Sequence, residues 1–134
     1  MAKGDFTFRG KTRDELNRMS VQEFAKLCNS RARRTMLRNV DQHFLKRVKK
    51  AHEVLSAGKF PKPLRTHNRD MIVMPQMIGI TIAIYNGKEF QNVEMKEKML
   101  GHYLGEYVLT RKRLVHGKAG IGATRSSTAI TARG

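Results

Sequence analysis

Apolar residues recur at helical spacing in the N-terminal third of the chain. Phe24, Leu27 and Cys28 fall on one face of a short segment. The four residues before it, SVQE at 20–23, fit a capping box, in which a hydroxyl and a carboxylate bind each other's free backbone N–H groups. The same signal, TRDE, occurs at 12–15. The sequence therefore predicts two short helices in this region.

Two further helices are predicted downstream. Ser30 is expected to cap a helix over residues 31–38, with Met36 and Leu37 as its apolar contacts. Asp41 is expected to cap a longer helix, which Gly58 ends and which Pro61 and Pro63 prevent from continuing. The residues that repeat at helical spacing in this longer helix are Phe44, Leu45, Val48, Ala51, His52 and Leu55.

The period of the pattern changes after these prolines. Residues 64–68 are a candidate strand, and residues 80–85, which are mostly β-branched, predict a buried strand. Asn86 and Gly87 both tolerate a positive φ and predict a type I′ hairpin turn, with a return strand over residues 90–95. Pro75 indicates a turn or a short irregular helix. Residues 96–104 are a candidate short helix that ends at Gly105.

These elements predict an α+β fold, with N-terminal short helices packed on a small, mainly antiparallel sheet and a basic extended C-terminal tail. Three regions are expected: an N-terminal helical extension over residues 1–30, an α+β domain over residues 31–110 and a basic flexible tail over residues 111–134. The tail is rich in Gly, Ala, Ser, Thr and basic residues, and its few large apolar residues are too scattered to form a core.

The formal net charge of +16 is concentrated in two regions. Residues 31–69 carry twelve Lys and Arg against Asp41 and Glu53, and six Lys and Arg follow Glu106 with no acid among them. Residues 70–106, which contain most of the predicted strands, carry three Lys against five acids. A polyanion is the partner that offsets such repulsion, and nucleic acids are the commonest polyanions. We therefore expect the domain over residues 31–110 to bind RNA.

The strongest candidate for phosphate contact is the arginine cluster in residues 31–38. Its four guanidiniums, which belong to Arg31, Arg33, Arg34 and Arg38, lie within about two helical turns. The alternative is an ordinary solvated helix face, which usually contains scattered acids. It is disfavoured because no acid lies between Glu23 and Asp41. Planar guanidinium also suits bidentate phosphate binding better than ammonium does.

A second candidate is the segment KPLRTHNR at 62–69, whose cations and polar groups can reach phosphate, ribose and base edges. His67 is flat enough to stack on an unpaired base. The alternative is an edge strand protected by charge; RNA contact is favoured because Asp70 is the only neighbouring acid. Lys88 at the hairpin tip is equally explained as a polar turn residue, and His102 as a packed or capping histidine.

Several other classes of site are disfavoured. The segment GKAGIG at 117–122 lacks the order of the phosphate-binding loop, and the five histidines show no H-E-x-x-H spacing. Cys28 is the only cysteine, so we expect no disulfide framework, no metal site and a reducing compartment. The longest apolar-rich run, residues 71–85, is interrupted by polar residues, and no signal peptide or membrane span is expected. No cofactor is indicated.

Three motifs resemble a known family: VMPQMIGITIAIYNGK at 73–88, MLGHYLGE at 99–106 and the dipeptide TR at 110–111. They are similar to those of the small-subunit ribosomal protein S19 family, and the resemblance extends from about residue 31 to about residue 125. The capped helical N-terminus and the tail at 117–127 resemble the archaeal and eukaryotic branch. Gln76 departs from the family, which usually has Glu at this position.

The resemblance implies a structural, non-enzymatic subunit of cytoplasmic ribosomes that lies in the head of the small subunit. Its implied partners are the 3′ major domain of small-subunit rRNA, ribosomal protein S13, and aminoacyl-site tRNA or mRNA near the tail. The implied rRNA contacts are Arg33, Arg34, Lys62, Arg65, Thr66, His67, Asn68, Arg69, Lys88, His102 and Arg111. On the basis of charge alone, the further candidate rRNA contacts are Arg31, Arg38, Lys112, Arg113, Lys118 and Arg125.

Two other functions compete with a structural rRNA-binding subunit. A free-standing nucleic-acid-binding regulator could use residues 31–38 as a recognition helix, but the sequence shows no apolar seam for the dimer that such regulators usually form. A nuclease would need clustered carboxylates to hold metal ions, and the acids of residues 70–106 form no recognisable metal motif.

Overall fold

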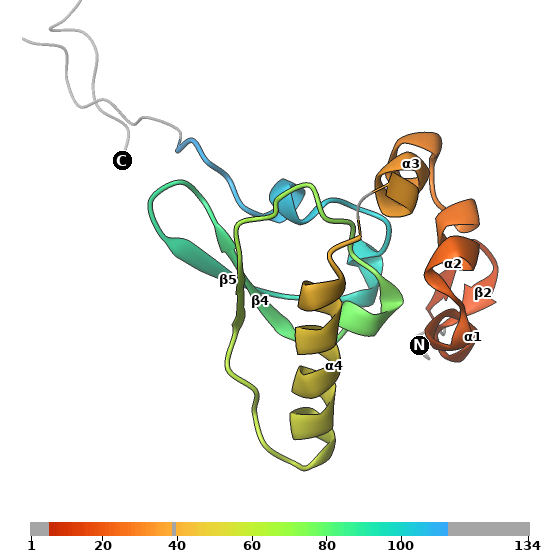
Figure 1. Ribbon diagram of the computed structural model, residues 1–134, viewed down its shortest axis with the longest axis horizontal. Coiled ribbons are helices and arrows are strands. Elements are labelled where there is room, and N and C mark those ends of the chain that lie inside the picture. The colour runs from red at the N-terminus through yellow and green to blue at the C-terminus, as the bar shows by residue number, and fades with distance from the viewer. Residues whose placement is uncertain (1–5, 39, 113–134) are drawn as a thin grey trace, which may run out of the picture.

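A computed structural model describes residues 6–38 and 40–112 of the chain, so most of the predicted tail lies outside the described residues. Three N-terminal helices form one group, and beside them lie a longer helix, a small sheet and several 3₁₀ turns (Figure 1). The helices are α1 (Arg13–Arg18), α2 (Val21–Leu27), α3 (Ser30–Arg38) and α4 (Gln42–Ser56). The strands are β1 (Thr7–Phe8), β2 (Lys11–Thr12), β3 (Leu64–Thr66), β4 (Thr81–Tyr85) and β5 (Phe90–Glu94). The 3₁₀ turns are η1 (Pro75–Met77), η2 (Glu97–Met99) and η3 (Leu104–Tyr107).

Both predicted capping boxes are confirmed. The Thr12 amide donates to Glu15 Oε2 at 3.1 Å, and α1 begins at the next residue. The Ser20 amide donates to Glu23 Oε2 at 2.8 Å, while Ser20 Oγ accepts from the Glu23 amide at 3.3 Å. The sequence signals predict these starts correctly because every partner lies within three residues.

A hairpin that the hydrophobic pattern does not predict precedes α1. The strands β1 and β2 pair antiparallel, and the pair Phe8–Lys11 encloses a two-residue loop. Arg9 and Gly10 in this loop have φ values of 53° and 78°. A positive φ at both positions is the feature of a type I′ turn.

The predicted helix over residues 31–38 is confirmed as α3, but its cap and one of its contacts differ from the prediction. Asn29 is the capping residue, because its Oδ1 accepts from the Ala32 amide at 2.8 Å, and Ser30 is already helical. Met36 is buried as expected, whereas Leu37 is 59% exposed. Ala32 lies one helical turn before Met36 and takes the second core position, which leaves Leu37 on the solvent side.

The long helix α4 begins and ends as predicted. Asp41 Oδ1 accepts from the Phe44 amide at 3.0 Å. At the other end Gly58 has a φ of +75°, its amide donates to Leu55, and the Lys59 amide donates to Val54. These two bonds form a Schellman motif, which requires the left-handed conformation that glycine adopts easily.

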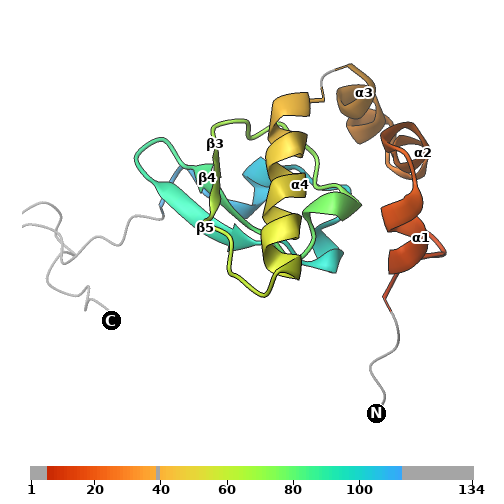
Figure 2. The same cartoon turned by 60° about the horizontal axis from the view of Figure 1, so that its bottom comes forward.

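The predicted α+β class is confirmed, and the larger sheet has the order β3-β4-β5. The strands β4 and β5 pair antiparallel, whereas β3 pairs parallel to β4. A parallel pair requires a crossover connection, and residues 67–80 with η1 provide it. In Figure 2, α4 lies against one face of this sheet, and α1, α2 and α3 lie on the side of α4 that is away from the sheet.

The hairpin between β4 and β5 is confirmed, but the predicted type I′ turn at Asn86 and Gly87 is wrong. The last strand pair is Tyr85–Phe90, so the loop has four residues. Gly87 has a φ of +103°, whereas Asn86 has no positive φ. Instead, Asn86 Oδ1 accepts from the amides of Lys88 and Glu89, both at 2.8 Å. The side chain of Asn86 thus closes the turn as an Asx turn does.

The predicted helix over residues 96–104 is also wrong. The chain forms the separate turns η2 and η3, and between them Gly101 has a φ of +78°. The Gly101 amide donates to Val73 O at 3.1 Å, and the Val73 amide donates to His102 O at 2.8 Å. Backbone groups that pair across the molecule cannot also form the ladder of an α-helix.

One hydrophobic core connects the N-terminal helices with the sheet. Helix α2 contributes Phe24, α4 contributes Val48, and β4 contributes Ile82 and Ile84, all at 0–2% exposure. Leu104 from η3 joins the same cluster at 0%. The C-terminal segment therefore belongs to the folded body up to about Val108, which is also buried.

Arg69 connects the end of β4 to this C-terminal segment. Its Nη1 donates to Tyr85 O at 2.8 Å, and its Nη2 donates to Gly105 O at 2.8 Å and also to Val108 O. The Gly105 amide donates in return to Arg69 O at 2.9 Å. A Cβ on Gly105 would lie 3.0 Å from Arg69 O, so glycine allows this close approach.

We expect Arg69→Gln to lower the free energy of unfolding by about 2–4 kcal/mol, because part-buried carbonyls lose charged donors. Arg65→Gln is the matched control, because Arg65 lies four residues away and its guanidinium, which lies over the Phe90 ring, donates to no carbonyl within the described residues. Urea unfolding of both variants measures the difference. Equal stability of the two variants would contradict the structural role of Arg69.

Candidate nucleic-acid interface

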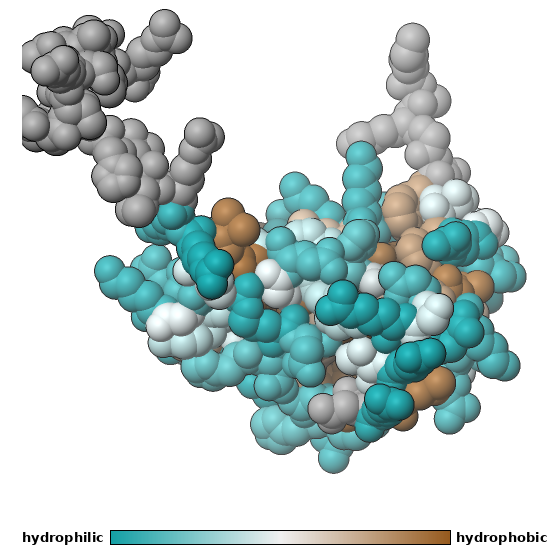
Figure 3. All heavy atoms as spheres, turned by 90° about the horizontal axis from the view of Figure 1, so that it is seen from above, coloured by the Kyte–Doolittle hydropathy of each residue, from teal (hydrophilic) through white to brown (hydrophobic). Residues whose placement is uncertain are grey.

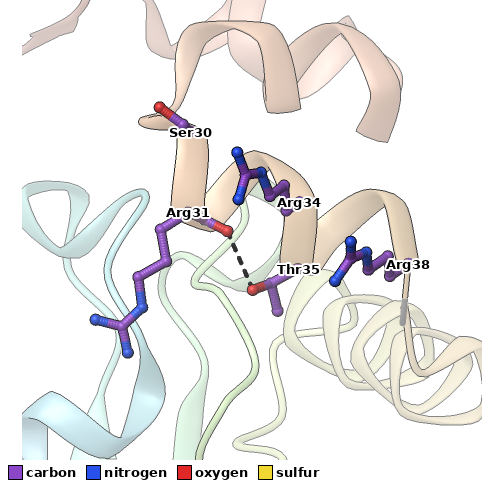
Figure 4. Close-up of a pocket in the computed structure, with 5 residues that line it drawn as sticks. All are labelled: Ser30, Arg31, Arg34, Thr35 and Arg38. Atoms are coloured by element: carbon purple, nitrogen blue, oxygen red, sulfur yellow. Dashed lines mark hydrogen bonds between the residues drawn. The ribbon is translucent and has the colours of Figure 1, made fainter.

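Three arginines of α3 form an open cationic surface, which we call the α3 face. Arg31, Arg34 and Arg38 lie at a helical spacing that places them on one side, where they line a hollow of about 460 Å³ (Figure 4). The hydroxyl residues Ser30 and Thr35 line the same hollow. Within residues 6–38 and 40–112, none of the three arginines forms an ion pair. The α3 face is therefore a concentration of positive charge that an anion can neutralise.

Arg31 is oriented by contacts with the C-terminal segment. Its guanidinium carbon lies 4.9 Å from the centre of the Tyr103 ring, a cation–π geometry. The Tyr103 hydroxyl lies 3.1 Å from Thr35 Oγ1, which also donates to Arg31 O at 3.2 Å. Tyr103 therefore holds Arg31 and Thr35 in place on the α3 face, a role that no pattern in the sequence indicates.

Arg33 does not belong to the α3 face, although it is one of the four arginines of the predicted cluster. Its Nε donates to Ala25 O, and its Nη2 donates to Lys26 O and Cys28 O, each at 3.3 Å. These carbonyls lie at the C-terminal end of α2, where a cation is favourable; Ala25 O also accepts from the Cys28 amide at 3.2 Å. The structure thus gives Arg33 a capping function between α2 and α3.

A second surface, which we call the sheet platform, consists of Arg65, His67, Tyr85 and Phe90. The His67 ring centre lies 4.6 Å from that of Tyr85 and 5.0 Å from that of Phe90. The Arg65 guanidinium carbon lies 5.4 Å from the centre of the Phe90 ring. Alternation along the strands places Arg65, Tyr85 and Phe90 on the face opposite Ile82 and Ile84. Rings beside cations are the groups that bind unpaired bases and their phosphates.

Tyr85 and Phe90 were not among the predicted site residues. The signal that could have identified them is their position as the last and first residues of the two strands that flank the hairpin loop. Strand alternation there places both side chains on the face that does not enter the core. Two large aromatic residues on a non-core face indicate a binding surface.

The other predicted residues of the segment at 62–69 differ in their positions. Lys62 is exposed in the loop before β3. Thr66 is 6% exposed on the inner face, and its Oγ1 accepts from the Asn68 amide. Asn68 Nδ2 donates to Asp41 Oδ2 at 3.1 Å, which connects this loop to the start of α4. Together with the carbonyl contacts of Arg69, this leaves the side chains of Lys62, Arg65 and His67 directed to the surface.

The remaining predicted residues lie elsewhere. Lys88 is exposed in the hairpin loop, and Arg111 and Lys112 are exposed at the end of the described chain. Arg113, Lys118 and Arg125 lie outside the described residues. In Figure 3, hydrophilic side chains cover most of the face seen from above Figure 1, and hydrophobic side chains appear only in separate patches.

His102 is exposed and forms a pair with Glu106. His102 Nδ1 lies 2.7 Å from Glu106 Oε2, and Glu106 Oε1 accepts from the Tyr103 amide. The hydrogen bond from His102 is the main cause that lowers the pKa of the Glu106 carboxyl, and the Tyr103 amide adds to it. In the part of the chain that the structure describes, no cluster of three or more His, Cys, Asp or Glu could hold a metal ion. No helix there is long and apolar enough to cross a membrane.

Comparison with known proteins agrees with the sequence motifs. The profile of the family described as Ribosomal protein S19 matches residues 30–116. The chain is also similar to proteins named Small ribosomal subunit protein uS19 from two strains of Halobacterium salinarum. Each is 47% identical over 125 residues, which cover 93% of this chain and 89% of the relative.

We expect Arg33→Ala to lower the melting temperature by several degrees, because about 1–2 kcal/mol is lost with the bonds to the α2 carbonyls. Arg34→Ala, one residue away in the same helix, should leave the melting temperature unchanged or raise it, because a repulsive charge is removed. Thermal unfolding followed by circular dichroism distinguishes the two. Equal melting temperatures for the two variants would contradict the stabilising role of Arg33.

We also expect acid to weaken the fold through Glu106 and Glu23. The Ser20 amide and hydroxyl lower the pKa of Glu23, as His102 and Tyr103 lower that of Glu106. A lowered pKa in the folded state gives stability that is complete above the usual carboxyl pKa and is lost as the pH falls through the folded value.

The melting temperature should therefore fall between about pH 6 and about pH 3, and it should fall less steeply in Glu106→Gln, which retains an acceptor but does not ionise. Glu94→Gln is the control, because the exposed carboxylate of Glu94 accepts no hydrogen bond within the described residues. An identical pH profile for Glu106→Gln and the control would contradict the prediction.

Proposed function

The chain belongs to the ribosomal protein S19 family, and from that premise we propose that it is a structural, non-enzymatic constituent of the small ribosomal subunit that binds small-subunit rRNA. The sheet platform is the observation that carries the proposal. It presents three rings and a guanidinium on one non-core face of the sheet. Such a surface suits the bases and phosphates of RNA better than it suits an apolar or a cationic partner.

The α3 face extends the proposed interface beyond the platform. Its three guanidiniums line an open hollow in which the Ser30 hydroxyl can donate to the same phosphate oxygens. In Figure 1 this helix lies on the opposite side of the molecule from the β4–β5 hairpin. The protein thus contacts RNA on two sides, and the small core between them keeps the two contact surfaces at a fixed separation.

We place the rRNA contact in the 3′ major domain, in the head of the small subunit of cytoplasmic ribosomes. There the protein lies beside ribosomal protein S13 and near the aminoacyl-tRNA site. The motifs at 73–88 and 99–106 support this placement, because they carry the resemblance to the family. Since Arg69 and Leu104 hold the second motif on the body, the chain leaves the fold near Val108, close to the hairpin (Figure 1).

Binding of the purified chain to a transcript of the 3′ major domain tests this proposal. Each neutralised phosphate should contribute about −0.7 to −0.9 to the slope of log K against log salt concentration, so we expect a slope steeper than about −2. Arg65→Gln and Arg34→Gln should each weaken binding by about 1–3 kcal/mol and reduce the slope by about one unit.

Arg18→Gln is the matched control, because Arg18 is exposed in α1 and lies outside both proposed surfaces. It should have little effect on affinity or slope. A slope shallower than about −2 would refute binding through phosphates. If Arg18→Gln and Arg65→Gln lost RNA affinity equally, the binding would be a general electrostatic attraction that involves no defined interface. Failure of the chain to co-sediment with small subunits in high salt would refute the assignment to the subunit.

A further inference from the structure

The loop that follows α4 presents an aromatic side chain with almost no contact to the rest of the protein. Phe60 is 98% exposed, the highest value among the exposed large hydrophobic side chains of the described chain. Val54 and Leu55, near the end of α4, are also exposed, at 39% and 42%. Three of the five exposed large hydrophobic residues within the described ranges therefore lie between positions 54 and 60. Such a concentration of exposed apolar surface indicates a contact with a partner.

The backbone holds Phe60 in this position. The Schellman motif at Gly58 fixes the Lys59 amide on Val54 O at 3.1 Å, one residue before Phe60. Pro61 and Pro63 follow and restrict the backbone further. Because the backbone on both sides of Phe60 is already restricted, ordering this loop on binding costs less entropy than ordering an unrestrained loop would.

The charges around Phe60 indicate which partner it contacts. Lys59 and Lys62 flank the ring in sequence and are exposed, and Lys50 is exposed one helical turn before Val54. Glu53 is the only acid between Asp41 and Asp70. An apolar protein surface would have to desolvate these ammonium groups without neutralising them. A nucleotide instead provides a flat base for the ring and phosphates for the ammonium groups.

We propose that Phe60 stacks on an unpaired base of RNA while Lys59 and Lys62 contact the adjoining phosphates. This site lies at the end of α4 that points away from α3 (Figure 1), and it includes neither the α3 face nor the sheet platform. It rests on the proposed RNA-binding function and adds a third contact, which requires a single-stranded or bulged nucleotide. The RNA at this site is recognised by the π face of a base and not by sequence.

The test compares substitutions of Phe60 that separate an aromatic ring from an apolar side chain. Phe60→Tyr retains the ring, whereas Phe60→Leu retains an apolar side chain without a π face. With the 3′ major domain transcript as probe, Phe60→Leu should weaken binding between about fivefold and about 100-fold. Phe60→Tyr should bind within about twofold of the natural chain. Neither should change the salt slope or the melting temperature, because no charge and almost no buried surface is altered.

Two further variants complete the experiment. The double variant Lys59→Gln, Lys62→Gln should reduce the salt slope by about one to two units. Phe60→Trp introduces the only tryptophan of the chain, and stacking on a base should quench its fluorescence when the transcript is added.

Each outcome decides between defined alternatives. If the natural chain does not bind the transcript, the proposed function fails and this inference fails with it. If the natural chain binds with a steep salt slope, but Phe60→Leu binds equally well and the fluorescence of Phe60→Trp is not quenched, the inference alone fails. If the fluorescence responds only when small-subunit proteins are added, a protein covers Phe60 and the proposed base contact is wrong.

Discussion

The fold depends on arginine side chains that bind backbone carbonyl groups. Arg69 joins the last carbonyl of β4 to two carbonyls of the C-terminal segment, and Arg33 joins the end of α2 to α3. A guanidinium can do this because its donors diverge in one plane and it keeps its charge at any physiological pH. A small, irregular body with short strands has many carbonyls that no helix or sheet ladder satisfies, and these arginines satisfy several of them.

The arginines thus have two separate roles, and only some of them contribute to the cationic surface. Of the arginines in residues 31–69, Arg33 and Arg69 bind backbone carbonyls of the fold itself, whereas those of the α3 face and Arg65 are presented outward. Aromatic rings accompany the outward group: Tyr103 lies under Arg31, and Phe90 lies under Arg65. A ring below a guanidinium limits its motion without neutralising it, so the cation remains available to a phosphate.

The sequence alone predicts the elements whose signals are local. The helix starts at Thr12, Ser20 and Asp41 and the helix end at Gly58 are correct, because each involves hydrogen bonds between residues at most five positions apart. The helix expected over residues 96–104 is wrong because the backbone there pairs with Val73, which is distant in sequence. The same limit applies to the site. Composition identifies a cationic segment, but only the fold determines that Arg33 binds carbonyls and Arg34 does not.

The contact between Thr35 and Tyr103 joins residues 68 positions apart, and that between Arg13 and Glu97 joins residues 84 positions apart. A chain is synthesised from its N-terminus, so α3 emerges from the translating ribosome well before the segment that packs against it. Until then the arginines of α3 are exposed on an incomplete chain, and Arg31 lacks its contact with Tyr103. Newly made protein therefore exposes a strongly cationic helix before it has a complete core, and in that interval the helix attracts polyanions without selecting among them.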